Sequence, residues 1–349
     1  MPADAEVERW ADRFGIPLVA SGVDYLRRDA RGPGASSLEA QDVFLEAADA
    51  ALSQLGPGEI AGLTLGTFLE TVDVPGGWAV RMRLLGTNAM DLSEVALRVV
   101  GDATPAFAAP AATYRRIARG NQALPDAIAA SLPDVRLGHR VRSVLHRTAS
   151  VTIRVEGDIE ISADAAVVAL PARVTAAMRF DPFLPDELAI ALHELRMGVA
   201  SKVAVPVEGA TIPRAMQSAE LPFWCWVANG AGGVRRCLTA FAGSELAQES
   251  LATAAGDPGP WLERLAELNP DLTACGTPVL KSWSLDPLTM GAYVSWDNRS
   301  WDRMDQFQRS VGRLAFAGEH TAGPDHHGTM EGAIRSGVRA AEQVLRMRG

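Results

Sequence analysis

The sequence predicts an α/β protein with two parts, one built on parallel strands and one on an antiparallel sheet with helices. Nearly continuous apolar runs at residues 163–170 and 314–317 are typical of buried parallel strands. Residues 221–227 and 236–242 instead alternate in polarity, which indicates antiparallel strands, and the glycine-rich segment 229–233 between them reads as a hairpin turn.

The N-terminal third is expected to be mainly helical. Val7, Trp10 and Phe14 recur on one side of a helix at residues 5–14, which Gly15 ends. A strand at 16–19 and a polar loop at 29–37 follow, and further helices are predicted at 38–55, 60–70 and 91–99.

The middle of the chain changes to short strands. A helix is predicted at 124–132, and Gly157-Asp158 marks a hairpin turn. Strands are predicted at 135–137, 141–145, 151–155, 159–161, 163–170, 200–205 and 279–283, and a broken helix at 244–266.

Composition excludes several function classes. The net charge of −9 argues against a nucleic-acid or anionic-membrane surface, because both favour basic patches. Three cysteines without a C-x-x-C pair indicate neither a disulfide framework nor a zinc site. The N-terminus lacks the apolar core of a signal peptide, and no apolar run approaches the roughly 20 residues of a membrane helix. A cytoplasmic protein is expected.

The stretch 313–348 organises the rest of the chain. A strand, a polar loop at 319–327 and a long helix from Thr329 follow one another. A face of small residues on that helix would let a sheet, a helix or a flat ligand approach the backbone, and the helix N-terminus suits an anionic or electron-rich group. A packed glycine-rich helix without a ligand explains the spacing equally well. The small residues recur every four positions: Gly328, Gly332, Ser336 and Ala340.

The segments FAGEHT, GTMEGA and SGVRAA at 316–321, 328–333 and 336–341 resemble the C-terminal flavin motif of the flavin-dependent amine oxidase family. That family includes monoamine, polyamine and amino-acid oxidases. The resemblance implies a Rossmann-like FAD-binding domain that lacks its first βαβ unit. It also implies an α+β substrate domain with a mixed or antiparallel sheet. The implied boundaries are 1–113 and 192–284 for the substrate domain, and 114–191 and 285–349 for the FAD domain.

The resemblance also implies the residues that contact the cofactor. Gly318 and Glu319 would meet the ribityl–phosphate region, and the backbone at Thr329 and Met330 would meet the flavin pyrimidine ring. The backbone of Val141 would touch the adenine side. Two bland alternatives stay open: Glu319 as a loop acid that accepts backbone N–H groups, and Val141 as a plain strand residue.

Three further residues are implied as catalytic. Lys202 would hold a water at the flavin N5 edge, although a lysine at a strand edge is more often simply solvated. Trp283 ends a strand before an acidic turn, and Tyr293 would form one wall of an aromatic cage that aligns the substrate amine. Thr329 stands where monoamine oxidases have the second tyrosine of that cage, which disfavours a simple arylalkylamine.

The expected cofactor is non-covalent FAD and no metal is expected. Ala292 occupies the position where some relatives have a cysteine bonded to the flavin, and alanine cannot form that bond. His320, His326 and His327 lie near the motif, but their spacing in a loop is not that of metal ligands.

The family opens with a strand–GxGxxG–helix unit that binds the ADP half of FAD, and these 349 residues contain none. Three explanations remain open: a separate small polypeptide that makes the enzyme a heteromer, a truncated gene model or fragment, or a relic without flavin. The predicted function is oxidation of a small-molecule amine by hydride transfer to flavin, with oxygen giving hydrogen peroxide. The alternatives are a non-catalytic binding subunit and a flavin-dependent desaturase of the protoporphyrinogen or carotene type.

Overall fold

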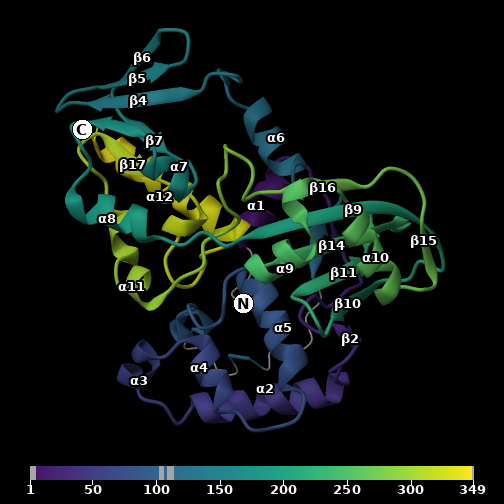
Figure 1. Ribbon diagram of the computed structural model, residues 1–349. Coiled ribbons are helices and arrows are strands. Elements are labelled where there is room, and N and C mark those ends of the chain that lie inside the picture. Colours follow the sequence, from purple (N-terminus) through teal and green to yellow (C-terminus); the bar gives the residue numbers. More distant parts are fainter. Residues whose placement is uncertain (1–4, 102–105, 108–113, 348–349) are drawn as a thin grey trace. The chain divides into compact units, whose positions relative to one another are not determined.

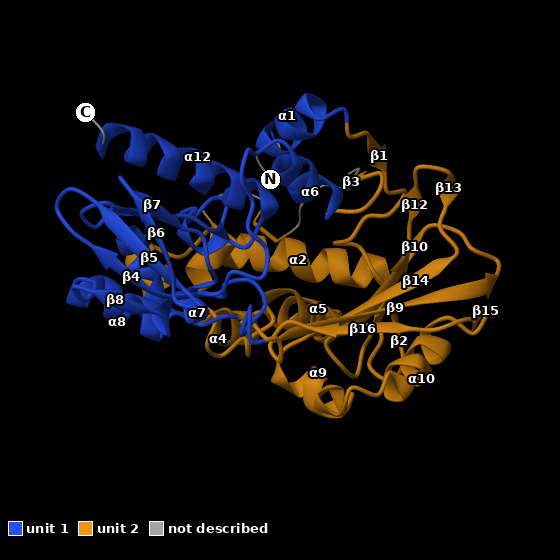
Figure 2. Cartoon of the chain, turned by 90° about the horizontal axis from the view of Figure 1, so that it is seen from above, with its two compact units in different colours: residues 1–15, 122–197, 287–349 blue, residues 16–121, 198–286 orange. Residues whose placement is uncertain are grey.

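The computed structural model describes residues 5–101, 106–107 and 114–347, which fold as two compact units (Figures 1 and 2). Unit 1 comprises residues 1–15, 122–197 and 287–349, and unit 2 comprises residues 16–121 and 198–286. The chain therefore crosses between units at four places, and each unit is assembled from segments far apart in sequence.

The units differ from the expected domains mainly at the N-terminus. Residues 1–15 belong to unit 1, whereas the sequence placed them with the helical segment that follows. The reason is tertiary: the carboxylate of Glu331 accepts hydrogen bonds from the N–H groups of Glu6 and Val7 and holds the first helix against the last one. The boundary expected at residue 113 falls in 108–113, outside the described residues.

Unit 2 is built on a seven-stranded sheet in the order β15-β9-β14-β11-β10-β2, with β16 also paired to β9 (Figure 1). All pairings are antiparallel except that of the short edge strand β2 with β10. The predicted alternation at 221–227 and 236–242 thus forms central strands of this sheet. The strands are β2 Asp29–Arg31, β9 Ala200–Gly209, β10 Arg214–Ser218, β11 Phe223–Val227, β14 Cys237–Gly243, β15 Leu272–Ala274 and β16 Val279–Ser282.

The two faces of this sheet carry different residues, because neighbouring side chains on a strand point to opposite faces. One face packs on α9 (Glu245–Ser250) and α10 (Gly259–Leu268) around the fully buried Trp261. On the other face, Trp224, Phe241 and Lys202 lie directly opposite one another across β11, β14 and β9. Lys202 is therefore on a central strand and not at a sheet edge.

Helices α2 to α5 form the remaining layer of unit 2. Gly76 and Ala89 adopt left-handed conformations at the two ends of α5, so the helix lies between them. The sequence predicted a helix at 91–99 instead. There Asp91 accepts the N–H of Ser93 in a local turn, and only a short 3₁₀ helix, η1, follows. The elements are α2 Leu38–Leu52, α3 Pro57–Gly62, α4 Leu65–Glu70, α5 Gly77–Asn88 and η1 Leu97–Val100.

Small strand pairs complete unit 2. β1 (Leu18–Ala20) pairs with β3 (Arg115–Ile117). The glycine-rich segment forms the hairpin of β12 (Asn229–Gly230) and β13 (Gly233–Val234), as predicted. The polar loop predicted at 29–37 is partly wrong, because its first three residues pair with β10 as strand β2.

Unit 1 contains the two-stranded parallel sheet of β7 (Ala166–Val168) and β17 (Leu314–Phe316), the two apolar runs that the sequence singled out. A separate four-stranded sheet runs in the order β6-β5-β4-β8. Its members are β4 Val141–His146, β5 Val151–Val155, β6 Ile159–Ala163 and β8 Arg179–Asp181. The helices are α1 Ala5–Arg13, α6 Ala123–Ala130, α7 Ala172–Ala176, α8 Asp186–Glu194, α11 Asn298–Trp301, η3 Met304–Gln308, η4 Glu319–Thr321 and α12 Met330–Met347.

The strand predicted at 135–137 is wrong. Its side chains have no sheet to pack on: Val135 is 46% exposed and Leu137 is 86% exposed. The apolar alternation there is too short to specify pairing without a neighbouring strand.

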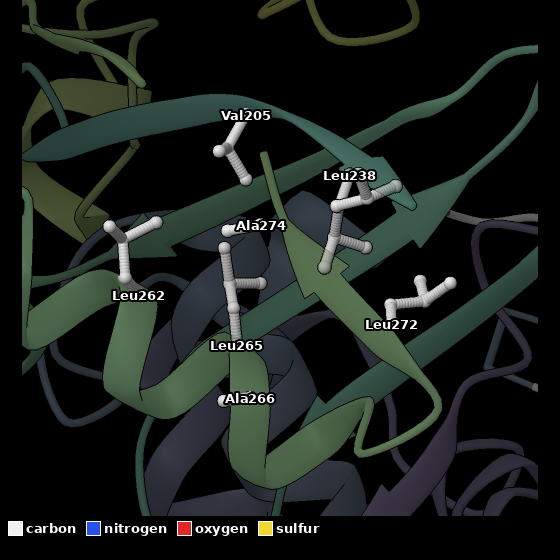
Figure 3. Close-up of a pocket in the computed structure, with 8 residues that line it drawn as sticks. Val205, Leu238, Leu262, Leu265, Ala266, Leu272 and Ala274 are labelled. Atoms are coloured by element: carbon white, nitrogen blue, oxygen red, sulfur yellow. The ribbon is translucent and has the colours of Figure 1, made fainter. Parts of the chain in front are cut away.

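An apolar cavity of about 30 Å³ lies between α10 and the sheet of unit 2 (Figure 3). It has room for about one water molecule. Val205 and Val207 line it, together with Leu265 of α10, so it opens on the face of the sheet opposite Lys202. We therefore treat it as a packing gap and not as part of the candidate site. Within the described ranges, no helix has both the length and the apolarity to cross a bilayer.

Candidate active site

Thr329 caps the N-terminus of α12. Its hydroxyl donates to the carbonyl of His326 at 2.6 Å and accepts the N–H of Gly332 at 2.9 Å, three residues along. This is the geometry of a helix N-cap, which satisfies one of the free N–H groups at the start of the helix. The side chain of Thr329 thus stabilises the start of the helix. The N–H of Met330 belongs to the first turn, where an α-helix has no internal acceptor for N–H groups.

Loss of this cap is expected to weaken unit 1. Thr329→Ala should lower the free energy of unfolding by about 1 kcal/mol, measured by urea denaturation followed by circular dichroism. Thr329→Ser keeps the hydroxyl and is the matched control, expected to lose much less. Equal losses in both variants would contradict the capping role and assign the effect to the missing methyl group.

The small face of α12 packs against protein. A Cβ on Gly332 would lie 2.1 Å from the carbonyl oxygen of His326, so only glycine allows the loop to approach. One turn on, the hydroxyl of Ser336 accepts the N–H of Gly318 at 2.9 Å. Ala340 packs on Ala315 and Ala317 of the strand region. The sequence left open whether a sheet, a helix or a flat ligand packs on this face. In the structure, the strand region and the loop before α12 pack on it.

Glu319 links three segments of unit 1. Its carboxylate accepts the N–H of Gly328 at 2.8 Å and the N–H of Val294 at 3.1 Å. Burial raises the pKa of Glu319 to about 7, and the two N–H donors partly oppose that rise because they favour the charged form. The carboxylate accepts backbone N–H groups, as the first alternative described, and the role of Glu319 toward the cofactor stays a prediction.

Gly318, Tyr293 and Met330 lie in the same unit. Gly318 has a φ of +138°, and a Cβ there would lie 2.7 Å from a ring carbon of His320, so the turn after β17 requires glycine. A Cβ on Gly328 would lie 3.9 Å from the ring of Tyr293, which places that ring beside the residue before the α12 cap. Met330 is 37% exposed at the first position of the helix.

Val141 lies at the start of β4, opposite Val155 and next to a bulge, and is half-buried. Its contacts with Val155 are those of an ordinary strand residue. Its role on the adenine side stays a prediction.

His320 and His327 are neutral near pH 7. Burial lowers the pKa of each to about 4. His320 packs edge-on against Phe307, and His327 packs edge-on against Trp296 and Trp301. In the part of the chain that the structure describes, no three His, Cys, Asp or Glu side chains form a metal-binding group.

Lys202 and Trp283 come together in unit 2. The ammonium of Lys202 lies 5.5 Å from the ring centre of Trp283, 5.6 Å from that of Phe241 and 5.9 Å from that of Trp226. Such distances are typical of cation–π contacts. Burial lowers the pKa of Lys202, and the nearby charge of Arg116 lowers it further.

Aromatic rings continue along this face of the sheet. Trp224 and Trp226 stack with their centres 4.4 Å apart, and Tyr25 meets both edge-on. Arg28 lies 3.7 Å over the ring of Trp224 and donates to the carbonyl of Tyr25. Because these rings surround Lys202, little water competes for its ammonium group, and Nζ can donate a hydrogen bond to a bound group.

Sequence reasoning missed Arg339. Its guanidinium donates to the carbonyls of Phe316 and Thr321 and to the Thr321 hydroxyl, at 2.6 to 2.9 Å. It therefore ties α12 to both ends of the turn that carries Glu319. The signal was present in the sequence, because Arg339 follows Ser336 by three residues and so lies on the same side of the helix.

Known proteins share this sequence pattern and fold. The pattern of the flavin-containing amine oxidoreductases matches residues 70–345. Polyamine oxidase 5 of Oryza sativa subsp. japonica is 28% identical over 229 residues, which are 61% of this chain and 45% of the relative. An L-amino-acid oxidase of Siganus canaliculatus is 42% identical over 71 residues, 20% of this chain and 13% of that protein. The chain thus spans about half the length of the polyamine oxidases it matches.

Two solved structures agree with the whole fold. Wild-type putrescine oxidase bound to putrescine superposes with a TM-score of 0.81 at 18% identity, covering 99% of this chain and 86% of that one. Cyclohexylamine oxidase from Brevibacterium oxydans gives a TM-score of 0.77 at 17% identity, with the same coverage. FAD is the cofactor of the family that these comparisons identify. The expected family, its fold and its cofactor are confirmed: this chain belongs to the flavin-containing amine oxidoreductase family.

Proposed function

We propose that this chain carries the substrate-oxidising part of an FAD-dependent amine oxidase that acts on a small-molecule amine. The observation that carries the proposal is Lys202, held half-buried among Trp226, Phe241 and Trp283 on a central strand of unit 2. A lysine with a lowered pKa in such surroundings is more typical of a functional site than of a solvated surface. The family membership supplies the reaction class.

The residues of unit 1 fit the flavin end of FAD. Thr329 fixes the start of α12, so the backbone at Thr329 and Met330 would meet the pyrimidine ring with the partial positive charge of a helix N-terminus. Gly318 and Glu319 would meet the ribityl–phosphate region, and Val141 the adenine side. Ala292 has no nucleophile, so the cofactor would be held without a covalent bond.

FAD, when bound, would take a hydride from the carbon beside the amine nitrogen and, on reoxidation by oxygen, give hydrogen peroxide. Trp283 and Tyr293 would orient the amine and exclude water from its carbon. Lys202 would hold a water through Nζ. Loss of that hydride would leave an iminium ion, which water would hydrolyse. Because the amine enters uncharged, no protein base is required.

Putrescine and spermidine are the first substrates to assay, since the relatives named above are polyamine and putrescine oxidases. An L-amino acid belongs in the same panel because of the L-amino-acid oxidase match. Peroxide production from any of these by the flavin-loaded protein supports the proposal. Flavin-loaded protein that oxidises none of a broad amine panel contradicts it.

We also propose that a strand–GxGxxG–helix unit outside these 349 residues, on a second polypeptide or on a longer form of this chain, completes the FAD site. The support is that the 349 residues contain no strand–GxGxxG–helix segment. Purified by itself, the chain is expected to bind little FAD, measured by absorbance in the flavin bands, because the loop that cradles the pyrophosphate is missing.

Co-expression with a βαβ polypeptide that carries GxGxxG should give a yellow complex. The matched control is the same polypeptide with its three motif glycines replaced by valine, which should not bind FAD. Stoichiometric flavin in the chain alone would contradict the need for that unit. Indifference to both FAD and the partner would favour a non-catalytic binding subunit.

A further inference from the structure

We propose that Glu319 is a positioning residue: its carboxylate bridges the N–H groups of Val294 and Gly328 and so fixes the ring of Tyr293 relative to the N-terminus of α12. This bridge is called the Glu319 brace below. The brace rests on the proposed function only for its consequence in catalysis, because its geometry lies entirely within unit 1.

The first support is that the two oxygens of the Glu319 carboxylate accept from N–H groups of two different segments. One carboxylate oxygen accepts from Gly328 and the other from Val294, at 2.8 and 3.1 Å. Gly328 directly precedes the cap of α12, and Val294 directly follows Tyr293. Each oxygen accepts one N–H, so the two segments are attached to the same carboxyl group.

The second support is that the base of the brace is itself fixed. Ser336 accepts the N–H of Gly318, and Arg339 donates to the carbonyls of Phe316 and Thr321. Both residues belong to α12. The turn that carries Glu319 is therefore locked to the same helix whose start the carboxylate holds.

The third support is that Val294 is held on its other side as well. It forms an antiparallel bridge with Met197, and the N–H of Ser295 donates to the carbonyl of Arg196. The segment 293–295 thus has two anchors. Together they leave the ring of Tyr293 beside Gly328, within van der Waals distance of where a Cβ would stand.

Amide hydrogen exchange and fluorine NMR test the brace without any flavin. The chain has three tyrosines, so 3-fluorotyrosine labelling gives three ¹⁹F signals, and Tyr293→Phe identifies one of them. In Glu319→Gln, an NH₂ group replaces one of the two oxygens, so one of the two backbone N–H groups loses its acceptor. We expect exchange at Val294 or Gly328 to speed up about 10- to 100-fold and the Tyr293 signal to shift.

Glu331→Gln is the matched control. Glu331 is buried and also accepts two backbone N–H groups, but those of Glu6 and Val7. Any change in exchange should be confined to those two residues, and the Tyr293 signal should stay in place.

Three outcomes would overturn the proposal: unprotected Val294 and Gly328 amides in the wild-type protein, an unmoved Tyr293 signal in Glu319→Gln, or an equal shift in Glu331→Gln. The wild-type exchange decides the point even if Glu319→Gln does not fold. A brace confirmed in a protein that oxidises no amine would leave the brace standing and refute the proposed function.

Discussion

Lys202→Met is expected to slow reoxidation of the flavin-loaded enzyme by oxygen about 100-fold, with a much smaller effect on its reduction by amine. Lys202 would contribute through a water held by Nζ, and methionine fills a similar volume without a donor. Stopped-flow absorbance of the two half-reactions, followed separately, measures the difference.

Lys281→Met is the matched control for this prediction. Lys281 lies directly opposite Lys202 on the neighbouring strand, but it is about half exposed and pairs with Asp286. It is expected to leave reoxidation unchanged. Equal rates in wild type and Lys202→Met for both half-reactions would contradict the role of Lys202.

The surroundings of Lys202 give a related check on the same experiment. Arg116 is the second cause of the lowered pKa of Lys202, after burial. Arg116→Gln should therefore move any pH midpoint assigned to Lys202 upward. A downward shift would mean that the midpoint belongs to another group.

Glu319 is expected to make the protein less stable as the pH rises from about 4.5 to about 7. The pKa of Glu319 is raised from its ordinary 4.5 to about 7, mainly by burial. The folded state then binds the proton more tightly than the unfolded state, so its contribution to stability is fully present below pH 4.5 and is lost as the pH passes 7. The difference of about 2.5 pH units corresponds to at most about 3 kcal/mol.

Chemical denaturation at a series of pH values measures this contribution. Glu319→Gln cannot titrate, so its stability should change less than that of the wild type between pH 5 and 8. Glu331→Gln serves as the control. It keeps Glu319, so the part of the decrease in its stability with pH that comes from Glu319 should be the same as in the wild type. The assignment would be contradicted if the stability of the wild type rose between pH 5 and 8 and only Glu331→Gln gave a flat profile.

The sequence by itself determined the fold class, the family and the cofactor. The apolar runs at 163–170 and 314–317 read as parallel strands because buried parallel strands are apolar on both faces. The recurrence of small residues every four positions, from Gly328 to Ala340, predicted a helix that begins near Thr329. These features are local, and a local pattern of side chains is sufficient to specify them.

Only the tertiary structure decided which partners the polar groups take. The sequence could not show that the Glu319 carboxylate is used by Val294 and Gly328, because Val294 is 25 residues away along the chain. Nor could it place residues 1–15 in unit 1, since Glu331 reaches Glu6 and Val7 across 325 and 324 residues.

The sequence misplaced the helix at 91–99 because left-handed residues at 76 and 89 set the ends of α5, and apolar spacing does not report backbone conformation. Hydrogen bonds between distant segments depend on how the whole chain packs, so a local pattern cannot determine them.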